Sequence, residues 1–131
     1  MLLQVCAPSG LAKAALLFYP AARQENDVDI NNLDDAVAAT AFRRLVTHLR
    51  HRSDAENIDL MGLAGFCRNC LADWVAQAEQ DVNQRALSRD EAREIIYGMP
   101  FSEWKERFQG EASDEQLARM KESVAKNAPD H

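Results

Sequence analysis

The feature that most constrains this chain is a series of helix-start signals, each followed by apolar residues at helical spacing. Ser88-Arg-Asp-Glu91 and Ser113-Asp-Glu-Gln116 are capping boxes, in which the first and fourth residues satisfy each other's backbone N–H groups. Ser53-Asp-Ala-Glu56 has the same pattern. No segment alternates polar and apolar residues with a period of two, and no Asn-Gly hairpin occurs. The sequence therefore predicts an all-α protein.

The caps and apolar stripes together predict five helices. The third ends at Tyr97, because Gly98 can adopt the left-handed conformation and Pro100 cannot continue a helix. Ser102 is expected to cap the short fourth helix. The expected helices are 37–52, about 57 to about 82, 89–97, 103–108 and 114–126.

The second predicted helix, about 57 to about 82, is apolar over most of its circumference. Such a helix is expected at the centre of a domain, buried on several sides. Gly62 and Gly65 lower its helix propensity, which suggests that another segment passes close to it. Its apolar stripe is Leu60, Leu63, Ala64, Cys67, Leu71, Trp74, Val75 and Ala78, broadened by Met61, Phe66 and Cys70.

The chain of 131 residues is long enough for one domain. Residues 1–35 form a variable N-terminal tail with an acidic linker, and residues 36–131 form the helical domain. The net charge of −6 argues against binding to nucleic acid or anionic lipid. Four arginines lie between residues 36 and 52 without an acidic residue, and we interpret them as a solvated face. No run of about 18 apolar residues predicts a membrane helix.

Three cysteines, Cys6, Cys67 and Cys70, are an odd number, and two of them are only three residues apart. This is not the pattern of a disulfide framework, and it indicates a reducing compartment. The sequence therefore predicts a cytoplasmic protein.

Cys67 and Cys70 are the strongest candidates in the sequence for a metal-binding or redox site. Two thiols at this spacing on a helix could chelate zinc or iron, with His48 as a third ligand and an open fourth position. They could also form a redox dithiol, but such pairs usually begin a helix, and this pair lies about ten residues into the predicted one. A third interpretation is packing alone, because free cysteine is often buried as a small apolar residue.

No catalytic motif accompanies the two cysteines. The sequence has no Ser-His-Asp spacing, no glycine-rich phosphate loop and no convergent carboxylate pair. Trp104, Phe101, Tyr97 and Met99 are expected to form a satellite cluster at the Gly98 corner. We therefore interpret the chain as a non-enzymatic domain that associates with itself, as a homodimer, or with a partner protein. The alternative is a metal-binding or dithiol redox function that uses Cys67 and Cys70 with His48.

Three stretches resemble the signature segments of a short bacterial family known as a domain of unknown function, number 1244. They are Asn57-Ile-Asp-Leu-Met61, Leu63-Ala-Gly-Phe-Cys-Arg-Asn-Cys-Leu71 and Tyr97-Gly-Met-Pro-Phe-Ser-Glu-Trp104. The resemblance extends over about residues 36 to 127.

This resemblance implies a compact orthogonal array of about five helices and no assigned activity. It also implies that His48, Cys67 and Cys70 belong to the family pattern, whereas His51 and Gly62 depart from it. The first 35 residues have no counterpart in the family.

Overall fold

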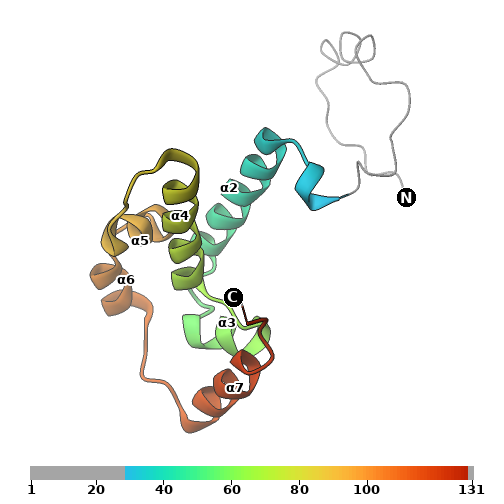
Figure 1. Cartoon of the computed structure of the whole chain (residues 1–131). Helices are drawn as coiled ribbons and strands as arrows, with labels where there is room; N and C mark the ends of the chain where they lie inside the picture. Colours follow the sequence, from blue (N-terminus) through green and yellow to red (C-terminus); the bar gives the residue numbers. More distant parts are fainter. Residues whose placement is uncertain (1–28, 130–131) are drawn as a thin grey trace, which may run out of the picture. The chain divides into compact units, whose positions relative to one another are not determined.

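The computed structural model describes residues 29–129 (Figure 1). Within that range the chain forms six α-helices and one 3-10 helix, and it contains no strand. The predicted all-α class is therefore confirmed. No helix in this range is long and apolar enough to cross a bilayer. Cys6 and residues 1–28 of the predicted tail lie outside the described residues.

The chain divides into two units, residues 1–39 and residues 40–131. In the first, the 3-10 helix η2 (Ile30–Asn32) is capped by Asp29, whose carboxylate accepts the Asn31 N–H at 2.9 Å. Asp34 then accepts the Ala36 N–H at 2.8 Å, at the start of α2 (Asp35–His51). The tail boundary at residue 35 stays a prediction.

The second unit contains the rest of α2 and five further helices. The capping boxes at Ser88 and Ser113 both form, as predicted. The box at Ser53 does not form, because α3 begins at Asn57 with Glu56 as its N-cap residue, and the Ser53 hydroxyl donates to the Arg50 carbonyl (3.3 Å). Pro100, rather than Ser102, is the N-cap residue of the fourth of these helices. The five are α3 (Asn57–Ala64), α4 (Arg68–Asn83), α5 (Arg89–Tyr97), α6 (Phe101–Phe108) and α7 (Asp114–Val124).

The single helix predicted from about 57 to about 82 is wrong. Gly65 adopts a left-handed conformation (φ 74°), donates its N–H to the Met61 carbonyl and ends α3, and α4 begins at Arg68. A Cβ at Gly65 would lie 2.2 Å from the Asn127 Oδ1, and a Cβ at Gly62 would lie 3.2 Å from the Arg119 side chain. The close neighbour expected at these two glycines is therefore the α7 end of the chain.

Two pairs of helices pack together in the second unit: α3 packs against α7, and α4 packs against α5 (Figure 1). Tyr97 and Trp104 have ring centroids 4.8 Å apart and are both buried in the main core, so they are not a satellite cluster. The buried core is Val46, Leu49, Leu71, Ala72, Ala92, Ile96, Tyr97 and Trp104.

The break at Gly65 also changes which side chains are buried. Leu71 is only 2% exposed, as expected for the central stripe. Leu63 and Trp74, predicted on the same stripe, are 78% and 40% exposed. A helical stripe holds its register only while the helix continues, so residues on opposite sides of the turn face different surroundings.

Candidate functional site

The two cysteines lie at the start of α4. Cys67 is its N-cap residue, with an extended backbone (φ −144°), and Cys70 lies in its first turn. The turn at Gly65 creates this position, since it starts a new helix immediately before the pair. The sequence-based expectation that the pair lies about ten residues into a helix is therefore wrong.

The two thiols differ in exposure. Cys67 is buried, with 6% of its surface exposed, whereas Cys70 is half-buried. Both are free thiols. The Cys70 Sγ lies 4.0 Å from the Met61 Sδ. Trp74, one helical turn after Cys70 in α4, stacks on Phe66 with ring centroids 6.1 Å apart. Cys70 therefore borders a sulfur-rich and aromatic surface, while Cys67 faces the interior.

Burial raises the pKa of the Cys67 thiol above its usual range. The backbone N–H groups of Cys70 and Asn69 act in the opposite direction, because they stabilise a thiolate at the helix start. The neighbouring Cys70 thiol interacts with Cys67 and raises its pKa further. The Cys70 thiol is thus close enough to Cys67 to influence the ionisation of Cys67.

Arg68, between the cysteines, is a buried cation that is only 2% exposed. Its Nη1 donates to the Ala55 carbonyl (2.7 Å), and its Nη2 donates to the carbonyls of Arg52 (2.7 Å) and Leu49 (3.2 Å). The guanidinium also lies 5.0 Å from the centre of the Trp104 ring. None of the ion pairs found in residues 29–129 includes Arg68. Arg68 therefore links the cysteine segment to the end of α2 by hydrogen bonds, and its guanidinium is a positive charge in the interior.

A chain of side-chain hydrogen bonds continues from Arg68. Its Nη1 donates to the Asn57 Oδ1 (3.1 Å), and the Asn57 Nδ2 donates to the Tyr97 hydroxyl (2.8 Å). The Tyr97 hydroxyl in turn donates to the Asn69 Oδ1 (2.8 Å). Burial raises the pKa of Tyr97 to about 12. Both residues between the cysteines, Arg68 and Asn69, are thus fixed by one network.

The sequence reasoning missed this network. The available signal was the position of Arg68, a charged residue between Ala64 and Leu71 on an otherwise apolar stripe. A charge is rarely placed on a buried face unless its donors are satisfied there. The partners could not be identified from the sequence, because they come from α2, α3, α5 and the connection between α2 and α3.

His48, the third proposed metal ligand, is an exposed residue of the last turn of α2. In the part of the chain from 29 to 129, no group of three or more His, Cys, Asp or Glu side chains is arranged to hold a metal ion. Cys67 and Cys70 thus share the start of α4, and a metal site made of these two residues with His48 stays a prediction.

Two hollows adjoin the helices around the site. One, of about 290 Å³, has Asn57, Asn69, Met61 and Phe101 in its walls, so it borders the buried polar network directly.

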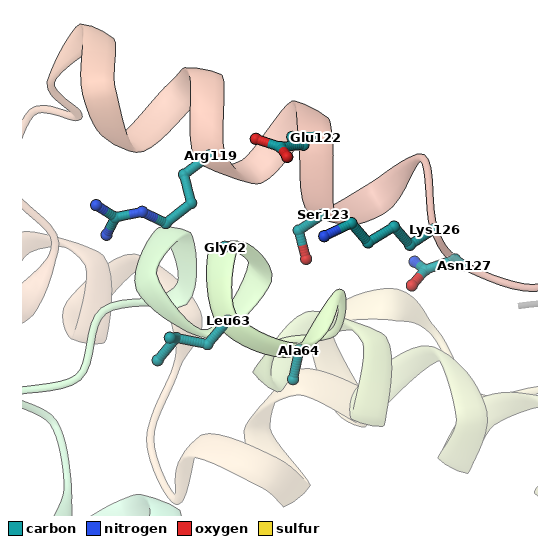
Figure 2. A pocket seen from close by; sticks show the side chains of 8 residues that line it. All are labelled: Gly62, Leu63, Ala64, Arg119, Glu122, Ser123, Lys126 and Asn127. Atoms are coloured by element: carbon teal, nitrogen blue, oxygen red, sulfur yellow. The ribbon is translucent and has the colours of Figure 1, made fainter.

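The other hollow is a groove of about 330 Å³ between α3 and α7. Figure 2 shows Arg119 and Lys126 on the α7 side of this groove, with Gly62 facing them from α3. In the same view Leu63 points to the side of α3 that faces away from α7. The groove thus carries the charged side chains of Arg119, Glu122 and Lys126, and Leu63 is among the α3 residues that line it.

Comparison with known proteins places the chain in a family without assigning an activity. No curated protein matches it. A family model described as "Protein of unknown function (DUF1244)" matches residues 55–122, slightly more than half of the chain and less than the expected 36–127. The match extends from the turn before α3 into α7 and includes both cysteines, Arg68, Asn57 and Tyr97. The chain therefore belongs to the DUF1244 family of proteins of unknown function.

Proposed function

We propose that this domain is a thiol–disulfide protein in which Cys67 and Cys70 form a reversible pair. The observation that carries the proposal is the turn at Gly65, which makes Cys67 the N-cap residue of α4 and places Cys70 in the first turn. An N-cap side chain and the residue three positions on approach each other closely, as they do in a capping box. A disulfide requires Cα atoms about 4.4–6.8 Å apart, and this spacing suits it.

The chemistry is an exchange of two electrons. Each thiol loses one proton and one electron as the Cys67–Cys70 disulfide forms, and a partner disulfide takes them up and leaves as two thiols. The reverse reaction reduces the pair. Arg68, the residue next to Cys67, is a buried cation, and a thiolate on Cys67 would interact favourably with its charge. A reducing compartment such as the cytoplasm would keep the resting pair as free thiols.

The test is a redox titration of the purified, untagged chain with Cys6 changed to alanine. Samples equilibrated in buffers of reduced and oxidised dithiothreitol are alkylated and weighed by mass spectrometry. We expect the two thiols to disappear together at a single potential, with no intermediate that has lost one. Cys67→Ala and Cys70→Ala are the matched controls, and each should retain its single thiol.

Two results would overturn the proposal. One is a folded protein that keeps both thiols at the most oxidising potential. The other is about one equivalent of zinc or iron in the purified protein that is lost in the Cys67→Ala variant, which would indicate a metal site instead.

A second candidate function is association with another copy or a partner protein, and the exposure of Leu63 favours it. Leu63 is 78% exposed on the side of α3 that faces away from α7 (Figure 2). If it lies in a dimer interface, light scattering after gel filtration should give a dimer mass that Leu63→Glu halves. Leu117→Glu, at a 44% exposed position on α7, is the matched control. A wild type that stays monomeric as its concentration rises, without copurified partners, would contradict association.

A further inference from the structure

We infer that Cys70 is the attacking thiol of the pair, that Cys67 is the resolving thiol, and that the substrate is a disulfide with apolar neighbours. The inference rests on the proposed function and adds to it the order of attack and the class of substrate. It begins from the difference in exposure between the two sulfur-bearing residues.

An external disulfide can reach Cys70 and not Cys67. Thiol–disulfide exchange requires the attacking sulfur to approach along the axis of the target S–S bond, so access limits the rate. Cys67 is 6% exposed, whereas Cys70 is half-buried. Burial also keeps Cys67 protonated by raising its pKa, and the thiol form is a poor nucleophile. The second cysteine of the motif is therefore the one that meets a substrate.

The reaction then has two steps. The Cys70 thiol loses its proton and its sulfur attacks the substrate disulfide, forming a Cys70–substrate mixed disulfide and releasing one substrate thiolate. The Cys67 thiol next loses its proton and attacks the Cys70 sulfur, which forms the Cys67–Cys70 disulfide and releases the second thiolate. The two thiolates take up the two protons, so two thiols of the domain become one disulfide while one substrate disulfide becomes two thiols.

The surroundings of Cys70 indicate the substrate class. Trp74 lies one helical turn further along α4 on the same side, and it is 40% exposed. Phe66 stacks on Trp74, and the Met61 sulfur lies 4.0 Å from the Cys70 sulfur. These side chains favour a substrate with apolar groups beside its disulfide, and the net charge of −6 disfavours an anionic one.

The test follows two single variants, Cys67→Ala and Cys70→Ala, in the full chain with Cys6 changed to alanine. Each is mixed with dithiodipyridine, a neutral aromatic disulfide whose released thione absorbs light, and separately with anionic oxidised glutathione. We expect Cys67→Ala to react about tenfold or more faster than Cys70→Ala and to hold a stable mixed disulfide. With one equivalent of dithiodipyridine, the wild type should release two thiones per chain and retain no mixed disulfide. Dithiodipyridine should react faster than oxidised glutathione by a larger factor with the folded protein than with the denatured one.

Denaturant and folding controls make the outcomes distinct. In denaturant the two variants should react at similar rates, because burial causes the difference between them. Circular dichroism checks that each variant is folded, and Cys67→Ser replaces Cys67→Ala if alanine prevents folding. A folded Cys70→Ala that reacts as fast as Cys67→Ala overturns the order of attack and leaves the proposed function in place. A wild type that releases one thione and keeps the mixed disulfide removes the resolving role of Cys67 and the proposed function with it.

Discussion

Replacing Arg68 by lysine tests whether the buried guanidinium holds the helix start in place. Arg68 donates to four acceptors at once, namely three backbone carbonyls and the Asn57 side chain. A lysine ammonium keeps the charge but is a single point with three donors, and it cannot span acceptors arranged around a planar fork. About two of the four acceptors would therefore lose their partner in the interior.

The expected loss of stability follows from that count. A hydrogen bond to a charged group contributes about 1.5–3 kcal/mol, and a buried acceptor without a partner keeps its desolvation cost. Part of the loss is recovered where the ammonium reaches the nearest carbonyls, so we expect Arg68→Lys to lower the free energy of unfolding by about 3–4 kcal/mol. In a chain of this size that corresponds to a fall in Tm of about 10–15 °C.

Urea denaturation followed by circular dichroism measures the effect, and Arg107→Lys is the matched control. The Arg107 side chain is 58% exposed and pairs with Glu103 at 2.9 Å, so this change should cost less than about 0.5 kcal/mol. A loss below about 1 kcal/mol for Arg68→Lys would refute the assignment of Arg68 as the residue that secures the start of α4.

Three further predictions concern other parts of the second unit. Leu71→Ala should destabilise the protein by about 2–5 kcal/mol, because Leu71 is only 2% exposed. Leu63→Ala should cost less than about 0.5 kcal/mol, because Leu63 is 78% exposed, and equal losses in urea titrations would contradict this. Stability should fall between about pH 10 and 12 by up to about 2–3 kcal/mol, because Tyr97 keeps its proton up to about pH 12 when folded and loses it near pH 10 when unfolded. Tyr97→Phe should flatten that dependence, and an unchanged slope would count against the raised pKa. Gly65→Ala should lower the free energy of unfolding by about 1–3 kcal/mol, because the backbone is left-handed there and the added Cβ would clash with Asn127. Asn127→Ala in the same chain should recover part of the loss, and a melting curve unchanged by Gly65→Ala would disprove the strain.

Most helix boundaries could be predicted because their causes are local. Ser88 with Glu91 and Ser113 with Gln116 form the expected reciprocal bonds, each within four consecutive residues. Gly98 ends α5 in the left-handed conformation, as predicted. These interactions depend on neighbours in the sequence and are therefore readable from it.

The candidate site could be predicted only in part. The sequence identified Cys67 and Cys70 as the candidate reactive pair. It left three interpretations open, namely packing, metal binding and redox chemistry. It placed them inside a continuous helix, because the apolar pattern on both sides of Gly65 is helical and an isolated glycine within such a pattern can be tolerated. It also grouped His48 with them, whereas the side chain of His48 is exposed on α2.

The sequence by itself determined the all-α class, the caps at Ser88 and Ser113, and the burial of Leu71. Only the tertiary structure decided that the central segment breaks into α3 and α4. The break depends on Asn127, whose side chain donates to the Gly65 carbonyl (2.9 Å), and on Arg68, whose guanidinium binds carbonyls at the end of α2. These contacts join residues that lie far apart in the chain, and no local pattern encodes them. Tertiary contacts can override helix propensity, and these accompany the left-handed turn at Gly65, after which Cys67 and Cys70 begin a helix.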